Sequence, residues 1–285
     1  MSDLKQKYEQ FTKQAVYKTI NHKDKEIEYY TLGNNSKQTL LLLTGGSGVS
    51  EPFFEYCLFF SHKFKVISFN YPECKSLNGL VNIILNIINT EQVKDLYICA
   101  QSMGGIIAQV MLLKNPELIK KLVLCHTTTV TKDLQQLYAN KLKENIKTLK
   151  DLEPVPELVL KQAITNKIKN SIEQHVSMNT EFWTNLFQQS IKQCNKQQLI
   201  TPIMLMNDLV KNYCFNEFSF AKNANKVLII DSKADKAFTI EQKLALNNIF
   251  KDATQKHFVN ESHMAILESV TKYIDLIDSF FDDKL

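Results

Sequence analysis

The sequence predicts an α/β fold in which a mostly parallel, twisted sheet is flanked by helices, with a helical cap inserted after the sixth strand. Short apolar runs typical of buried strands alternate with helical patterns up to residue 125. That alternation gives way to a long helical stretch and then returns near residue 227. The chain has 285 residues and is 44% hydrophobic, which suits one sizeable core. We therefore expect residues 1–125 and 224–285 to form the core and residues 126–223 a cap subdomain.

The first part of the chain supplies six expected strands and three expected helices. Residues 39–44 are a continuous apolar run, as in a strand that is covered on both faces. Residues 104–114 are apolar on nearly all sides, which predicts a buried helix that ends before Pro116. The expected strands are residues 15–20, 26–32, 39–44, 65–69, 95–100 and 121–125, and the expected helices are residues 51–62, 80–88 and 104–114.

The second part begins with amphipathic helical patterns from residue 126 to about residue 223, without a convincing strand. Residues 227–230 restore the strand pattern, residues 241–250 are helical, and residues 256–259 are the last expected strand. A closing helix is indicated by one apolar stripe, made by Ile266, Val270, Ile274, Ile277 and Phe281. A helical insertion between two halves of one sheet is typical of a lid.

The sharpest chemical signal is the segment Ala-Gln-Ser-Met-Gly-Gly at residues 100–105, between an expected strand and an expected helix. A serine on such a tight turn presents its hydroxyl at the carboxyl edge of the sheet, and small residues two positions before and after it let neighbouring backbone pack closely. Ala100 and Gly104 meet that requirement, although glycine is commoner at the first of the two positions. We therefore predict Ser102 as a nucleophile.

Glycine usage marks a second loop that would face this turn. Five of the 7 glycines fall either at the serine turn or in residues 45–48, directly after the third expected strand. Glycine is retained where the backbone needs unusual angles or close approach. We expect the backbone N–H groups of Gly46 and Met103 to form an oxyanion hole, although the glycines of residues 45–48 also fit a plain tight turn.

A serine nucleophile needs a base, and a histidine base needs an acid. His263 lies between the last expected strand and the closing helix, where it could reach over the serine; His126, at the end of a neighbouring strand, is the rival base and otherwise a pocket residue. Asp235 follows the strand at residues 227–230 after a short turn, and Asp231, at the end of that strand, is the competing acid. The order Ser102, Asp235, His263 is the one that a serine on a strand-to-helix turn usually has.

With these motifs in place, the whole chain resembles the α/β-hydrolase superfamily, and residues 40–128 look most similar to its maspardin-like branch, including residues 66–72 before the serine turn. The resemblance implies nucleophile, acid and base at Ser102, Asp235 and His263. The usual His-Gly before the oxyanion residue is here Thr44-Gly45. Some members of this branch have lost catalytic residues and act as binding proteins, whereas this sequence retains all three.

The implied reaction is hydrolysis of a carboxylic ester or thioester through an acyl-enzyme, without metal or organic cofactor. The same triad would also serve a lyase or a C–C bond hydrolase, and a non-catalytic adaptor is the alternative of a different class. We expect Phe53, His126 and Trp183 to contact a small-molecule substrate with an apolar acyl group. Cap residues expected to roof that pocket, or else to pack among the helices, are Leu160, Ile164, Phe182, Trp183, Leu186 and Phe187.

Composition argues against other classes of partner. The sequence contains no arginine, the usual reader of phosphates and guanine edges, so we predict no nucleic-acid partner. Its six cysteines have neither Cys-x-x-Cys nor zinc-site spacing, which favours a reducing compartment. The start lacks an apolar signal region, and no uninterrupted apolar stretch is long enough for a bilayer, so we expect a cytoplasmic protein without a transmembrane segment. The oligomeric state is not predicted.

Overall fold

The computed structural model describes residues 3–33 and 38–285 and contains an eight-stranded, mostly parallel sheet. The strand order is β1-β2-β4-β3-β5-β6-β7-β8, in which β1 and β2 pair antiparallel and β3 to β8 run parallel. The α/β fold class predicted from the sequence is confirmed. The strands are β1 Val16–His22, β2 Lys25–Leu32, β3 Gln38–Leu43, β4 Lys65–Ser68, β5 Asp95–Gln101, β6 Ile119–Cys125, β7 Val227–Ser232 and β8 Thr254–Phe258.

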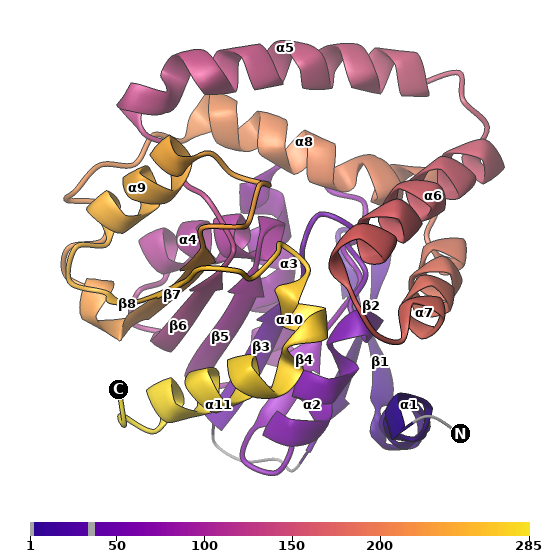
Figure 1. Cartoon of the computed structure of the whole chain (residues 1–285), viewed down its shortest axis with the longest axis horizontal. Helices are drawn as coiled ribbons and strands as arrows, with labels where there is room; N and C mark the ends of the chain where they lie inside the picture. Colours follow the sequence, from indigo (N-terminus) through magenta and orange to yellow (C-terminus); the bar gives the residue numbers. More distant parts are fainter. Residues whose placement is uncertain (1–2, 34–37) are drawn as a thin grey trace.

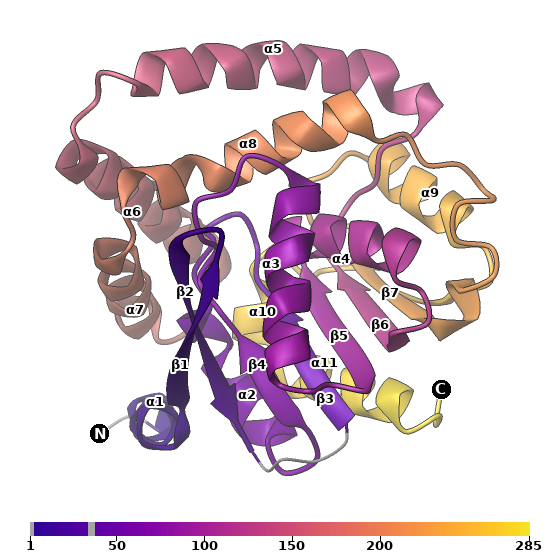
Figure 2. The same cartoon turned by 180° about the vertical axis from the view of Figure 1, so that it is seen from behind.

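Helices cover both faces of this sheet (Figures 1 and 2). On one side lie α3 (Leu77–Thr90) and α4 (Met103–Lys114), and on the other lie α2 (Phe54–Phe60) and α11 (Val270–Phe281). Ser76 caps α3 by accepting the N–H of Gly79 at 3.1 Å. The remaining helices outside the cap are α1 Asp3–Gln14, α9 Ile240–Ile249 and the short α10 Ala265–Glu268.

The core is divided in two by the sheet, because successive side chains of a strand point to opposite faces. On β3, Leu41 and Leu43 pack with α3 and α4, whereas Leu40 and Leu42 pack with α2 and α11. The same alternation continues through β5, β6 and β7. Both faces of the central strands are therefore dry, which fixes the register of the strands and the position of every loop at their carboxyl ends.

Between β6 and β7 the chain leaves the sheet and forms four helices, here called the cap helices, which lie along one edge of the sheet (Figure 1). Asn195 and Gln198 form a capping box at the start of α8, and Pro202 lies inside that helix. None of the described helices is long and apolar enough to cross a membrane. The cap helices are α5 Gln135–Leu152, α6 Glu157–His175, α7 Thr180–Gln193 and α8 Lys196–Asn212.

Three features differ from the sequence-based expectations. Helix α1 was not expected; it docks through Tyr8 and Phe11, whose rings contact Phe54 of α2. The expected helix at residues 51–62 is a 3₁₀ turn, Glu51–Phe53, followed by α2. The single closing helix is two helices, α10 and α11, separated at Ser269. Residues 1–2, on which part of the expectation about a leader rests, lie outside the described residues.

Candidate active site

Ser102 occupies a sharp turn between β5 and α4. Its backbone has φ +53° and ψ −114°, a left-handed conformation that is unusual for a residue with a side chain. The N–H of Ser102 donates to the carbonyl of Cys125 at 3.0 Å, which ties the turn to β6. A Cβ at Gly104 would collide with the backbone of Leu43, and one at Gly105 would lie 2.5 Å from Oγ1 of Thr127. Both glycines are therefore required for α4 to start this close to the neighbouring strands.

His263 contacts this serine from the loop between β8 and α10. Nε2 of its ring lies 3.1 Å from Oγ of Ser102, and Nδ1 lies 2.9 Å from Oδ2 of Asp235. Because a carboxylate only accepts hydrogen bonds, Nδ1 carries the proton and Nε2 is free to accept from the serine hydroxyl. The sequence-predicted residues Ser102, Asp235 and His263 thus form one continuous hydrogen-bonded chain.

Asp235 lies in the loop that follows β7, and its side chain is buried. Oδ1 accepts the backbone N–H of Ala237 at 2.8 Å, while Oδ2 accepts from His263. Burial by itself would raise the pKa of Asp235, but the hydrogen bonds from His126 and His263 outweigh it and hold that pKa well below its ordinary value. The carboxylate is therefore ionised at neutral pH.

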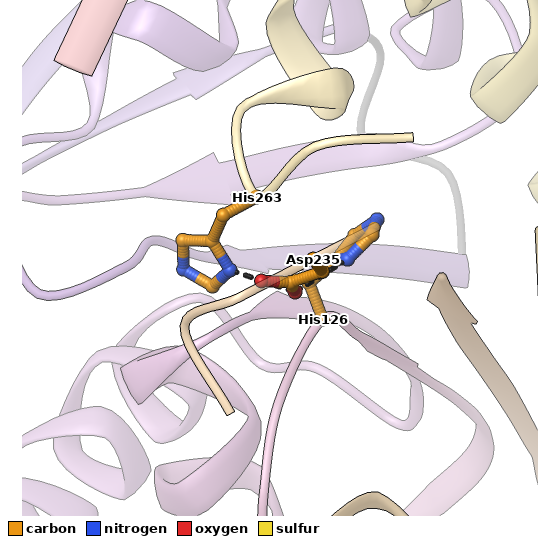
Figure 3. Close-up of side chains that lie close together, drawn as sticks. All are labelled: His126, Asp235 and His263. Atoms are coloured by element: carbon orange, nitrogen blue, oxygen red, sulfur yellow. Dashed lines mark hydrogen bonds and ion pairs between the residues drawn. The ribbon is translucent and has the colours of Figure 1, made fainter. Parts of the chain in front are cut away.

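His126 differs from its expected place in the pocket. It lies behind Asp235, fully buried, and its Nδ1 is 2.9 Å from the same oxygen, Oδ2, that His263 contacts. Figure 3 shows the carboxylate between the two imidazole rings. The other nitrogen of His126, Nε2, lies 2.6 Å from the hydroxyl of Tyr273 on α11. As neither nitrogen faces Ser102, this geometry does not suit His126 for the role of rival base.

Asp231, the competing acid, lies on β7 and points to a different histidine. Its Oδ1 is 2.6 Å from Nδ1 of His257 on β8, at the edge of the sheet. Asp231 therefore has a histidine partner of its own, but among the described histidines that contact Asp235 or Asp231 only His263 contacts Ser102.

The same cluster is the one place in the described chain where three potential metal-binding side chains converge, since donor atoms of His126, Asp235 and His263 lie within 4.8 Å of one another. Both histidine nitrogens that face the carboxylate are at 2.9 Å from its Oδ2, a normal N–H···O separation. The arrangement thus has the geometry of two N–H donors on one carboxylate, and each nitrogen that points at Asp235 is already used as a donor.

The two expected oxyanion residues flank the serine. Met103 is the first residue of α4, where backbone N–H groups have no partner within the helix. Gly46 lines the cavity beside Ser102, in the loop after β3, and a Cβ there would meet no atom within 4 Å. At the neighbouring Gly45 a Cβ would lie 2.4 Å from Oε1 of Gln101, so the end of that side chain would have to move.

A cavity of about 390 Å³ opens beside Ser102 and His263, between the sheet edge and the cap helices. Its lining is mainly apolar and includes Phe53, one of the residues for which a substrate contact is predicted. Trp183, which was expected to contact the substrate, is not in the lining of this cavity; it is buried against Phe54 and Phe182. Lining residues contributed by the cap are Ile164, Lys167, Ile168, Ser171, Phe187, Leu199, Pro202 and Ile203.

Most of these cap residues were not foreseen. On α6, Ile164, Lys167, Ile168 and Ser171 follow the spacing i, i+3, i+4, i+7 and so form one helix face, which the sequence pattern could have indicated. Of the six cap residues expected to roof the pocket, Ile164 and Phe187 do so. Among the residues that the structure describes, the lining contains no acidic side chain and a single lysine, Lys167.

Comparisons with known proteins agree with this architecture. A family model described as alpha/beta hydrolase fold matches residues 38–270. No curated protein sequence is significantly similar to the chain. Among solved structures, a hydrolase from Pseudomonas aeruginosa is 13% identical with a TM-score of 0.71, covering 93% of this chain and 98% of its own.

Two further solved structures widen the range of chemistry found on this fold. One, from a study of carboxylesterases of the thaumarchaeon Nitrososphaera gargenis, is 11% identical with a TM-score of 0.70 and covers 94% of this chain and 98% of its own. The other, 2-hydroxy-6-oxo-6-phenylhexa-2,4-dienoate hydrolase from a Rhodococcus species, is 15% identical with a TM-score of 0.69 and covers 94% and 99%. At these identities the likeness concerns the fold.

Proposed function

The chain belongs to the α/β-hydrolase fold family, and from that premise we propose that it is a serine hydrolase that cleaves a carboxylic ester or thioester. The observation that carries this proposal is the continuous hydrogen-bonded chain from Oγ of Ser102 through the ring of His263 to Asp235. Family membership supports a hydrolytic function, and the geometry supports these three residues as nucleophile, base and acid.

In the proposed reaction, Nε2 of His263 takes the hydroxyl proton while Oγ of Ser102 attacks the carbonyl carbon of the substrate. The negative charge that develops on the carbonyl oxygen would be held by the N–H groups of Gly46 and Met103. The protonated His263 then gives its proton to the leaving group, which departs as an alcohol or thiol. A water molecule, deprotonated by His263, attacks the acyl-enzyme and releases the carboxylic acid and free Ser102.

The cavity supports a substrate with an apolar acyl group. Phe53, Val49 and Phe187 contribute apolar surface next to Ser102, and the helix face of α6 closes the opposite side. A volume of about 390 Å³ lies within the usual range of ligand pockets, roughly 300–1,000 Å³. Only a part of the lining is polar, which favours burial of a hydrocarbon chain over that of a sugar or nucleotide.

The decisive experiment is labelling of the purified protein with a fluorophosphonate probe, which reacts with activated serines. We expect the wild-type protein to be labelled at Ser102 and the variant Ser102→Ala to be folded and unlabelled. Losing the nucleophile of a triad costs several orders of magnitude in turnover, so hydrolysis of p-nitrophenyl butyrate should disappear with the labelling.

Ser262 provides a matched control, because it lies beside His263 in the sequence but does not line the cavity. The variant Ser262→Ala should therefore be labelled as the wild type is. An unlabelled wild-type protein, or labelling that survives in Ser102→Ala, would contradict the proposal, and the first result would instead favour a binding protein built on the same fold.

A further inference from the structure

Asp235 carries a second histidine that a Ser-His-Asp triad does not require. His126 contacts Oδ2 of Asp235 through Nδ1 at 2.9 Å, the same separation that His263 has from that oxygen. The two rings approach the carboxylate from different elements, one at the end of β6 and one after β8, with ring centres 6.0 Å apart (Figure 3). One carboxylate oxygen thus accepts two imidazole N–H donors.

The backbone holds His126 in this place at a conformational cost. Its φ is +46°, in the left-handed region that residues other than glycine adopt uncommonly, although histidine does so more often than most. Its N–H donates to the carbonyl of Ile230 on β7 at 2.8 Å, which fixes the residue between two paired strands. A strained conformation of this kind persists only where surrounding contacts enforce it, and such positions cluster at functional sites.

Asp235 determines which nitrogen of His126 carries the proton, and Tyr273 is the partner of the other nitrogen. Because Asp235 only accepts, Nδ1 of His126 must be the donor, and Nε2 then accepts the hydroxyl hydrogen of Tyr273 at 2.6 Å. Burial, together with nearby acidic groups, raises the pKa of Tyr273, so this hydroxyl keeps its proton. Both nitrogens of the buried His126 ring are therefore hydrogen-bonded.

We propose that His126 is a positioning residue for the triad, an inference that rests on the function proposed above. By donating to Oδ2, it holds the carboxylate of Asp235 in the orientation that His263 needs. By sharing the negative charge of that oxygen, it also weakens the pull of Asp235 on the proton of His263. Tyr273 supports this arrangement by holding the ring of His126 through its other nitrogen, Nε2.

The charged and titratable groups around Asp235 come from several elements, and a substitution at His126 removes none of them. His263 and Ala237 donate to its carboxylate, and Nζ of Lys243 on α9 donates to its backbone carbonyl at 2.5 Å. The remaining groups that act on Tyr273 or Asp235 are Cys125 on β6, Asp231 on β7 and Glu261 in the loop before α10.

The test compares His126→Leu, which removes the donor, with His126→Asn, which keeps an amide N–H near the position of Nδ1 and tolerates a positive φ. With p-nitrophenyl butyrate, His126→Leu should lower kcat by about 10- to 100-fold, the cost of a small misplacement of catalytic groups. KM should change little, because His126 does not line the cavity. His126→Asn should recover most of the lost kcat.

The pH profile separates positioning from mere packing. Without the second donor, Asp235 stabilises the imidazolium form of His263 more strongly, so the acid limb of kcat should move to higher pH in His126→Leu and stay in place in His126→Asn. A residue that only fills space would lower the thermal stability and leave this limb unmoved. Wild-type kcat and an unmoved limb in a folded His126→Leu would overturn the inference while leaving the proposed function intact.

A second measurement does not depend on turnover. Proton NMR should show two downfield N–H resonances for the histidines that share Oδ2, and in His126→Leu the remaining one should move further downfield because Asp235 then serves a single imidazole. His257→Leu is the matched control, since it removes a histidine from the other His–Asp pair. An unchanged resonance in His126→Leu would overturn the inference even if the protein proved to hydrolyse no ester.

Discussion

Of the three His–Asp pairs beside β7, the two formed by His263 and His257 differ in what the second nitrogen of each histidine contacts. In the first pair, His263 donates to Asp235 and its other nitrogen faces Oγ of Ser102 at 3.1 Å. In the second pair, His257 contacts Asp231 at 2.6 Å, and its other nitrogen faces the side chain of Gln255 at 3.3 Å. By the His–Asp distance alone, the hydrogen bond of the second pair is the stronger of the two.

Burial separates the two pairs more clearly than distance does. The side chain of Asp235 is 1% exposed and that of His263 25%, whereas the values are 12% for Asp231 and 51% for His257. An ion pair that faces water contributes little to stability, while a buried carboxylate with three donors is fixed in place and ionised. A His–Asp hydrogen bond therefore indicates catalysis only where it is buried and leads on to a nucleophile.

The largest expected difference between the pairs is in turnover. Asp235→Asn should leave the fold intact and lower kcat by roughly a thousandfold or more, because the amide favours the wrong tautomer of His263. Asp231→Asn should change kcat far less, since neither Asp231 nor His257 contacts Ser102. Ester hydrolysis measured on both variants, with circular dichroism as the folding control, checks this; a large loss in Asp231→Asn alone would show that the pairs have been assigned in the wrong order.

A smaller difference is expected in acid stability. Because the pKa of Asp235 is lowered on folding, its ionised form contributes stability that is present above the ordinary carboxyl pKa of about 4 and is lost as the pH falls below it. The difference in Tm between the wild type and Asp235→Asn should therefore shrink as the pH falls from about 7 to about 3. Burial would raise the pKa of Glu91, but Lys18, Lys65 and Tyr29 lower it to about 2. Glu91 therefore makes the stability of both proteins decrease at acid pH.

Asp231→Asn supplies the reference for those thermal melts, since it removes a carboxylate that is also bonded to a histidine beside β7. Its Tm difference from the wild type should be small across the same pH range. Parallel behaviour of the two variants would mean that the buried and the exposed pair contribute alike, contrary to the comparison above.

The smallest effect is expected at Lys167. Its side chain is exposed, so a pair between its charge and a substrate should contribute as little as other exposed ion pairs do. Lys167 lines the mouth, is exposed, and forms no ion pair with any residue in the described ranges. Lys167→Met should lower kcat/KM for an ester with a distal carboxylate by about fivefold at most, the equivalent of an exposed pair worth about 1 kcal/mol. A neutral ester of equal length is the control; equal losses for both esters would assign Lys167 to packing.

The sequence predicted best what depends on neighbouring residues. The strand-to-helix turn at Ser102, the glycines that let it pack, and the loops after β7 and β8 were all placed by local patterns, because parallel strands bring their carboxyl ends to one edge. All eight strands were anticipated, with boundaries that differ by a few residues. Helix α1 was overlooked, although Leu4, Tyr8 and Phe11 recur at helical spacing in a polar segment.

What the sequence did not predict depends on contacts between distant segments. The partner of His126 at Nε2 is Tyr273, and nothing local to either residue indicates that they meet. Trp183 looked like a cavity residue because a cap helix has two faces that could be buried, and the choice between them was made by Phe54 and α1. Tertiary packing decides which face of a cap helix lines the cavity and which packs against other helices. The periodicity of one helix does not distinguish these two faces.

The cap helices leave and rejoin the sheet at adjacent, directly paired strands, since Leu122 to Cys125 of β6 pair with Val227 to Ile230 of β7. The two ends of the excursion are thus joined by the sheet whatever lies between them. The entropy of closing such a loop grows only with the logarithm of its length, so that doubling it costs about 0.6 kcal/mol. The closure entropy therefore limits the length of the segment between β6 and β7 only weakly, so the walls of the cavity can change over generations, provided that the side chains that pack against the sheet helices are kept, while Ser102, Asp235 and His263 stay where they are.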